Sequence, residues 1–379
     1  MTDYYKAPVI YYHSVGPVND NWIRKFLTTD FESFQKQIEW IRKKFKLISF
    51  KELWQIRNGI IPPVKNALIL NFDDGYLDNW IWVFPLLKKF GLKATIFISP
   101  EFVDQRPVIR PNLEDVWNGN AGYHELNEFG FLSWEELKIM EQSGVMDVQS
   151  HTLTHTKYFV SDILTGFHHP GCDILYPAGN LFPERKPFYI NDKTFENILP
   201  YGYPLFEEKS ALIARKVEIN PDFIEECVSE LKKYDFRNYR FETAFNLVKP
   251  VYELYKKGAK IITYFESQDE YIKRAKKEIS ESKKIIEDKL GKKVEFLCWP
   301  HGDNNNILHQ LALNAGYLMT TTGKYLSLNK DITRIPERTC MDFKTFRKKQ
   351  KTIFKLKALS GRLPYYYILN NYRKLKDFI

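Results

Sequence analysis

Short apolar runs alternate with longer segments of helical periodicity along most of this chain. The runs that predict strands are residues 8–12, 47–50, 67–72, 94–98, 146–150, 294–298 and 317–321. The segments that predict helices are residues 31–44, 79–90, 133–143, 269–290 and 305–315. Strands that are apolar along their whole length are typical of a parallel sheet covered by helices, so the pattern predicts an α/β fold.

Two segments interrupt this alternation. Residues 101–131 contain Pro, Gly and Asn without clear periodicity, and residues 157–268 include several Pro- and Gly-rich pieces. So long a stretch inside a repeating pattern predicts an insertion, and we expect a subdomain near the functional site. His168 and His169 lie within it. They could line a cleft, although surface histidines are the plainer interpretation.

The excess positive charge is concentrated toward the end of the sequence. The formal net charge is +9, and residues 342–379 hold eleven basic and two acidic residues, so the rest is formally neutral. The chain has no recognised nucleic-acid reading motif, and we expect no nucleic-acid partner. Aromatic and aliphatic residues are interleaved with the basic ones. This pattern favours either a basic amphipathic element on an anionic membrane surface or a closing helix with a solvated Lys-rich face.

No signal for export or membrane insertion is visible. No apolar run reaches the roughly 18 residues needed to cross a bilayer, and the first residues lack an apolar region followed by a cleavage site. The four cysteines (Cys172, Cys227, Cys298 and Cys340) are widely spaced, which favours reduced structural thiols. We therefore expect a cytoplasmic protein.

Two adjacent carboxylates follow a strongly apolar strand. Asp73, Asp74 and Gly75 come directly after residues 67–72, and α/β enzymes place their sites at the carboxyl ends of parallel strands. Adjacent like charges repel each other unless a cation separates their roles, so one carboxylate could bind a metal while the other acts as a base. The same tripeptide is common in ordinary turns, so it is weak evidence alone.

Two histidines four residues apart follow another predicted strand. His151 and His155 could lie on one side of a helical turn and bind one metal ion. A zinc metalloprotease needs Glu directly after the first histidine, and Thr152 stands there, which excludes that class. Such a pair is often surface or core filling. Its place at a strand end favours a metal site, because it could complete an Asp-His-His set.

A third signal is the turn after residues 294–298. Trp299, Pro300, His301 and Gly302 predict a rigid turn that could aim a backbone N–H at a developing oxyanion and offer aromatic surface to a sugar. The alternative is a plain strand-to-helix loop.

Together these segments resemble the motifs of the polysaccharide deacetylase family (the NodB homology domain, carbohydrate esterase family 4). Residues 71–75 (NFDDG) are similar to its TFDDG motif, residues 151–155 (HTLTH) to its H(S/T)xxH motif, and residues 299–302 (WPHG) to its PYG motif. Residues 11–15 (YYHSV) resemble the YHxV opening of the branch that deacetylates poly-N-acetylglucosamine. The resemblance covers residues 8 to about 336 apart from the two insertions.

The resemblance implies a distorted (β/α)7-type barrel over residues 1–341. The large insertion would lie between the HxxxH motif and the last third of the chain, and residues 342–379 would form a basic extension. It also implies a divalent metal, usually zinc, bound by Asp74, His151 and His155. Asp73 would be the general base that takes a proton from the attacking water.

Further roles follow from the same resemblance. His13 would be the acid that protonates the leaving amine, although it could instead be a core histidine at a strand end. Arg334 would orient Asp73 by ion pairing, although such a pair could equally be structural. His301 replaces the Tyr that is usual in the family, which leaves only the backbone role there. The later LxH motif of the family has no clear match, since Leu308-His309 lacks the intervening residue.

These features predict a metal-dependent hydrolase that removes an N-acetyl or N-formyl group from a sugar in surface polysaccharide or glycolipid biosynthesis. The expected partner is an N-acylated carbohydrate, which could be nucleotide- or lipid-linked, and residues 342–379 could contact the membrane surface near it. The alternative is a carbohydrate-binding or assembly protein that keeps the fold without turnover. Such a protein would hold no firmly bound metal.

Overall fold

The structure, a computed structural model, describes residues 5–18, 25–127, 129–190, 193–323 and 331–377. The chain forms two compact units. The first comprises Met1–Leu153 and Ile279–Ile379, and the second comprises Thr154–Glu278. The second unit contains the whole of the large predicted insertion, whereas residues 101–131 belong to the first.

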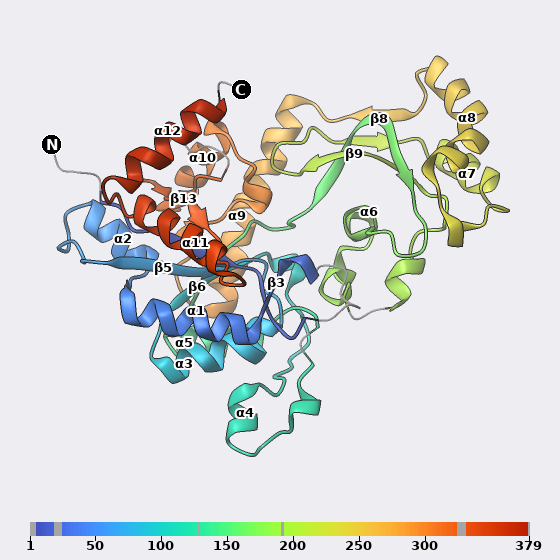
Figure 1. Cartoon of the computed structure of the whole chain (residues 1–379). Coiled ribbons are helices and arrows are strands. Elements are labelled where there is room, and N and C mark those ends of the chain that lie inside the picture. Colours follow the sequence, from blue (N-terminus) through green and yellow to red (C-terminus); the bar gives the residue numbers. More distant parts are fainter. Residues whose placement is uncertain (1–4, 19–24, 128, 191–192, 324–330, 378–379) are drawn as a thin grey trace. The chain divides into compact units, whose positions relative to one another are not determined.

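A parallel sheet forms the centre of the first unit (Figure 1). Its strand order is β14-β13-β12-β7-β6-β5-β1-β15, and β4 pairs with the start of β5. The strands are β1 (Val9–Tyr12), β4 (Lys46–Leu47), β5 (Ala67–Phe72), β6 (Ala94–Ile98), β7 (Met146–Ser150), β12 (Phe296–Leu297), β13 (Met319–Thr321), β14 (Arg334–Ile335) and β15 (Arg338–Thr339). No pairing that closes the sheet into a barrel occurs among the described residues. The predicted α/β fold is confirmed.

Helices of the first unit begin and end where the sequence supplies caps. Asp30 Oδ2 accepts the Ser33 N–H at 3.0 Å, and Ser133 opens a helix with a capping box. Residues 47–50 were predicted as a strand, but only Lys46–Leu47 pair, because Ser49 caps the next helix. The helices are α1 (Phe31–Lys44), α2 (Phe50–Arg57), α3 (Phe84–Phe90), α4 (Leu113–Trp117), α5 (Trp134–Gln142) and α10 (Asn306–Asn314). α9 (Gln268–Leu290) is continuous from the second unit into the first.

Burial of the sheet fixes the strand ends that carry polar residues. All six residues of β5 are buried. Ile69 of β5, Phe97 of β6 and Phe296 of β12 share one apolar cluster with Phe50 and Leu53 of α2. Because a one-residue slip would turn these side chains out of the core, the register of the strands and the position of the loops that follow them are well determined.

The second unit has its own architecture. β8 (Lys157–Phe167) pairs antiparallel with β9 (Pro204–Ser210), and β10 (Val217–Ile219) pairs antiparallel with β11 (Ile262–Phe265). Helices α7 (Pro221–Glu230) and α8 (Phe241–Lys257) pack at one end of the long β8–β9 ribbon (Figure 1), and α6 (Leu175–Leu181) lies along β8. A separate core of Phe167, Phe206, Phe223, Cys227, Leu231, Ala244 and Val248 holds these elements together.

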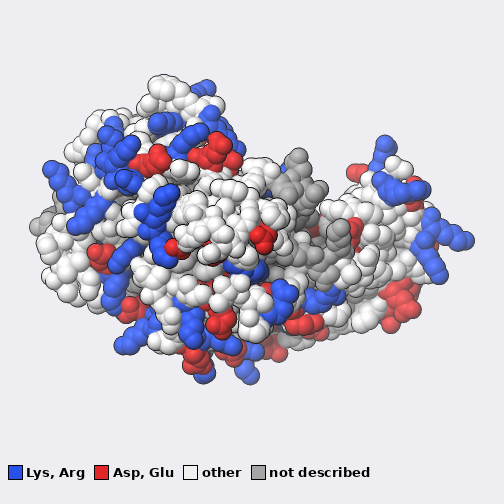
Figure 2. Space-filling model, turned by 90° about the horizontal axis from the view of Figure 1, so that it is seen from below, with Lys and Arg blue, Asp and Glu red and all other residues white. Residues whose placement is uncertain are grey.

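The basic C-terminal segment forms two helices, α11 (Phe346–Leu359) and α12 (Tyr365–Asp377). Leu356 is 1% exposed, and Arg373 donates to the Glu337 carboxylate, so this segment packs on the first unit. Basic side chains are scattered among acidic ones on the face of the molecule shown in Figure 2. No helix within the described ranges is both long and apolar enough to cross a bilayer.

Candidate active site

Asp73 is held in one orientation by several donors. It follows β5 and is 2% exposed, and its N–H donates to Tyr12 O at 2.9 Å. Arg338 Nη1 lies 2.7 Å from both carboxylate oxygens, and Asn71 Nδ2 donates to one of them at 2.9 Å. Burial alone would lower the pKa of Arg338, but the Asp73 charge outweighs it and raises that pKa, so the guanidinium is charged.

The expectation that Arg334 pairs with Asp73 is wrong. Arg334 is 1% exposed, and its guanidinium donates to Asn304 Oδ1 at 2.9 Å and to Thr320 and Thr321 oxygens at 3.3 Å. β14 lies at the far end of the sheet from β1, whereas β15 pairs directly with β1, next to β5. Arg338 is therefore the basic residue that reaches Asp73. The sequence signal that could have identified Arg338 as the partner of Asp73 is its place as a second arginine, four residues after Arg334.

The three predicted metal ligands come together beside Asp73. Ligand atoms of Asp74, His151 and His155 all lie within 4.8 Å of one another. Asp74 Oδ1 is 3.3 Å from His151 Nε2. Two ligands of one tetrahedral zinc ion, each about 2.0–2.1 Å from it, lie roughly 3.4 Å apart, so this spacing suits a shared ion.

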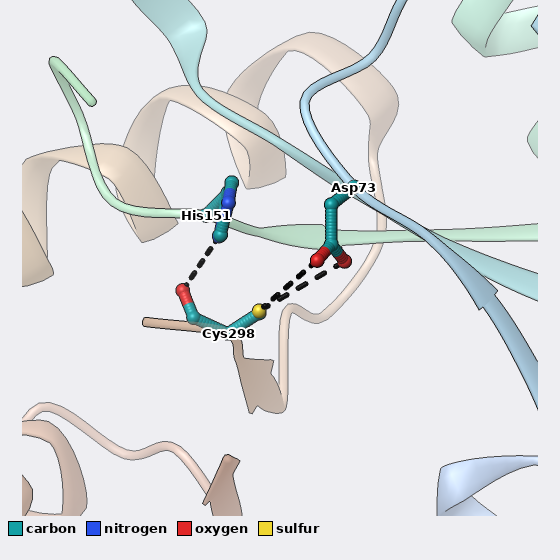
Figure 3. Close-up of side chains that lie close together, drawn as sticks. All are labelled: Asp73, His151 and Cys298. Atoms are coloured by element: carbon teal, nitrogen blue, oxygen red, sulfur yellow. Dashed lines mark hydrogen bonds between the residues drawn. The ribbon is translucent and has the colours of Figure 1, made fainter. Parts of the chain in front are cut away.

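A backbone carbonyl fixes the tautomer of His151. The ring is 3% exposed, and its Nδ1 lies 2.8 Å from Cys298 O (Figure 3). A carbonyl only accepts, so Nδ1 carries a proton, and Nε2 faces Asp74 and is the atom that could bind a metal, as in metal-binding histidines whose other nitrogen donates to a carbonyl. Burial opposes protonation of the ring, but Cys298 and the Asp74 and Asp73 carboxylates outweigh it and raise the pKa of His151. The negative charge of the groups around the His151 ring suits a bound cation.

A second set of ligand types lies deeper. Asp73, His151 and Cys298 are all buried with ligand atoms within 4.8 Å of one another, and Cys298 Sγ is 3.9 Å from each Asp73 oxygen (Figure 3). Asp73 already accepts two charge-assisted hydrogen bonds from Arg338, and Nε2 of His151 faces Asp74. The geometry therefore favours the first set as the metal site.

The loops that carry these residues are strained. In the described part of the chain, six residues other than Gly have positive φ, and four belong to the three predicted motifs: Asp74 (74°), Thr152 (65°), His155 (41°) and His301 (56°). Such conformations cost about 1–3 kcal/mol each and cluster at functional sites. Gly75 also has φ 74°, and a Cβ there would lie 3.0 Å from Ile98 Cγ2.

His13 lies beside the same cluster. It follows β1 and is half-buried, and the centres of the His13 and Tyr11 rings are 5.5 Å apart. The Arg338 guanidinium carbon also lies over the Tyr11 ring, 4.7 Å from the ring centre. Burial, then Cys340, raise the pKa of the Tyr11 phenol, which keeps it neutral. The role of His13 as an acid stays a prediction.

The turn after β12 differs from its expected role. Trp299 is 0% exposed, so its indole does not offer a face to a sugar. The backbone N–H of Trp299 donates to Thr321 Oγ1 at 3.0 Å. Pro300 is buried, and His301 is exposed with the positive φ that aims the next peptide unit. An oxyanion role for the His301–Gly302 backbone stays a prediction.

His309 is buried, with Nδ1 2.9 Å from Thr320 Oγ1 and Nε2 3.0 Å from Thr333 Oγ1, which is a structural role.

Comparison with known proteins gives the same family for this region. A sequence profile described as polysaccharide deacetylase matches residues 61–170. A Bacillus subtilis protein named as a polysaccharide deacetylase is 27% identical over 151 residues, which are 40% of this chain and 43% of that protein. A poly-β-1,6-N-acetyl-D-glucosamine N-deacetylase of Staphylococcus epidermidis is 30% identical over 161 residues, 38% of this chain and 48% of that protein. The chain thus spans less than half the length of these relatives.

Solved structures share the fold over most of the chain. A de-N-acetylase from Aggregatibacter actinomycetemcomitans aligns with a TM-score of 0.53 and 18% identity, covering 91% of this chain and 98% of that one. The deacetylase domain of BpsB from Bordetella bronchiseptica aligns with a TM-score of 0.51 and 19% identity, covering 89% and 96%. At these identities the likeness establishes the fold.

Proposed function

We propose that this chain, which carries a domain of the polysaccharide deacetylase family, hydrolyses N-acetyl groups on an N-acetylglucosamine polymer in surface polysaccharide synthesis. The observation that supports this most is the set of Asp74, His151 and His155 beside a separately held Asp73. Two neighbouring carboxylates with different partners can take different roles, one as a ligand and one as a base.

The donor set fits a divalent metal, and zinc is our proposal for its identity. One carboxylate and two imidazoles make three protein ligands, which leaves a position open as in catalytic zinc sites. Bound there, the ion would polarise the acyl carbonyl and lower the pKa of a water molecule.

The side chains around this set can move the protons that amide hydrolysis requires. Asp73 accepts a proton from the attacking water, and Arg338 and Asn71 hold its oxygens in place while it does so. His13, directly after the neighbouring strand β1, donates a proton to the departing amine. The backbone at His301 and Gly302 stabilises the oxyanion.

The substrate class comes from the relatives. The Staphylococcus epidermidis relative is named for poly-β-1,6-N-acetyl-D-glucosamine, and we carry that polymer over to this chain as its substrate. A lipid-linked form would bring the enzyme to a membrane. Tyr367, Ile368 and Tyr372 of α12 are 60%, 52% and 65% exposed among basic residues, which supports contact between residues 342–379 and an anionic bilayer. Equal flotation with liposomes after removal of residues 342–379 would contradict that contact.

Acetate release tests the proposed activity. Zinc-loaded protein incubated with a β-1,6-linked N-acetylglucosamine oligomer should release acetate. The Asp73→Asn variant should lose roughly 10²–10⁴-fold of the rate, as expected for removal of a general base. The exposed Asp269 provides the control Asp269→Asn, which should match the parent. Equal acetate release by Asp73→Asn and the parent, or none by either, would contradict the proposal.

A further inference from the structure

A pocket in the second unit has a chemistry that the active site does not account for. Its volume is about 670 Å³, within the range of about 300–1,000 Å³ that is usual for small-molecule sites. It lies wholly within Thr154–Glu278. The lining residues that define its chemistry are Tyr201, Glu225, Ser229, Lys232, Tyr234 and Phe236.

One wall of the pocket is a polar stripe along α7. Glu225, Val228 and Ser229 have the i, i+3, i+4 spacing that places side chains on one face of α7, and Lys232 lies in the turn directly after the helix. The opposite face of α7 is apolar and belongs to the core of the unit. In the described structure, the side chains of Glu225, Ser229 and Lys232 make no hydrogen bond or ion pair, so their donors and acceptors are available to a ligand.

The facing wall is aromatic. The Tyr201 and Phe236 ring centres are 5.5 Å apart, and those of Tyr234 and Phe236 are 5.1 Å apart. Tyr234 and Phe236 pack one side against the core and remain half-buried, which leaves ring surface toward the pocket. Gly202 allows this packing, because its φ is 89° and a Cβ there would lie 3.1 Å from Leu231 Cβ.

We infer that this pocket binds sugars of the N-acetylated glycan other than the one that is hydrolysed. Aromatic faces on one side and free polar groups on the other suit a pyranose ring, which has apolar C–H faces and hydroxyl edges. Ser229 and Lys232 can donate to hydroxyl and acetamido oxygens, and Glu225 can accept from hydroxyls. The choice of ligand rests on the proposed function. A polymer offers many sugars, so a site for those that are not being hydrolysed adds to the affinity for the polymer.

Calorimetric titration with a β-1,6-linked N-acetylglucosamine oligomer tests this inference. The titration uses full-length zinc-loaded Asp73→Asn protein, so that the ligand is not consumed. Adding Lys232→Ala or Phe236→Ala should weaken binding about tenfold, as for a central contact of a binding site. Lys233→Ala and Phe265→Ala change an adjacent lysine and an exposed phenylalanine outside the pocket, and they should bind like the parent. Because Lys232 is exposed, its replacement leaves the fold intact even if Phe236→Ala does not.

The outcomes separate this inference from the proposed function. If Lys232→Ala and Lys233→Ala bind equally well, or if only Asp74→Ala lowers affinity, the ligand occupies the active site alone and the inference is overturned. If the Lys232 effect is seen but the protein with intact Asp73 releases no acetate, the pocket stands and the proposed hydrolysis fails.

Discussion

The two units place their polar chemistry in different ways. In the first unit, His13, Asp73 and His151 each follow the carboxyl end of a parallel strand, so residues far apart in sequence meet at one edge of the sheet. In the second unit, the pocket combines one helix face with loop aromatics around an antiparallel ribbon. In a parallel sheet, residues that follow strands can therefore be predicted to meet at one edge. In the second unit no such rule relates the helix face to the loop aromatics.

Removing a metal ligand from the first unit should have the largest effect. His151→Ala deletes the ligand that Cys298 O orients, so bound zinc and acetate release should both be lost, the latter by at least about 10³-fold. The exposed His124 gives the control His124→Ala, which should keep its zinc. Elemental analysis of the purified proteins checks the result. Full zinc content in His151→Ala would contradict this site, whereas a parent protein without firmly bound zinc would support the alternative of a protein without turnover.

Arg338 and Arg334 offer a sharper test, because both are arginines of the first unit with little exposed surface, and only Arg338 pairs with Asp73. Arg338→Met frees the Asp73 carboxylate, and we expect about a 10²-fold fall in kcat and a loss of roughly 3–5 kcal/mol in the free energy of unfolding. Arg334→Met should lower stability because it removes the donor to the Asn304, Thr320 and Thr321 oxygens, while kcat per folded molecule is kept. Steady-state kinetics with urea unfolding checks both. A larger kcat loss in Arg334→Met would reverse the assignment.

The separate core of the second unit predicts local unfolding. Phe223 is 0% exposed, and Phe223→Ala should cost about 3–5 kcal/mol in that core. Amide hydrogen exchange should then speed up in β8 and β9 while β5 and β6 keep their protection. Phe265→Ala, at an exposed position, should change neither. Equal loss of protection in both pairs of strands would show that the units unfold together.

Much of the first unit could be predicted because its pattern is local. The apolar run of residues 67–72 and the Ser133 capping box specify a strand and a helix start without tertiary information. Arg338 could not be identified, because its pairing depends on β15 lying next to β1, which no local pattern encodes. Trp299 was assigned to a sugar because sequence does not show on which side of a turn an indole is buried. The pocket on α7 needs the fold before its two walls can be related.

His309 gives the smallest expected effect, on the pH dependence of stability. Burial, then the Arg334 charge, lower the pKa of His309 to about 4, although Asp331 opposes this. The unfolded chain, with the ordinary value near 6.5, binds the proton more readily, so stability falls as pH drops from about 6.5 toward 4. His309→Gln removes this titration and should flatten that part of the stability curve. A parent and variant with parallel curves in thermal unfolding would contradict the assignment.

The central claim is that Asp74, His151 and His155 hold a metal, and that the neighbouring Asp73 is not one of its ligands. X-ray absorption at the zinc edge of the loaded protein tests it most directly, because the alternative set contains Cys298. Our account predicts only nitrogen and oxygen neighbours at about 2.0–2.2 Å. A sulfur neighbour at about 2.3 Å would place the ion on Asp73, His151 and Cys298, and would contradict the account.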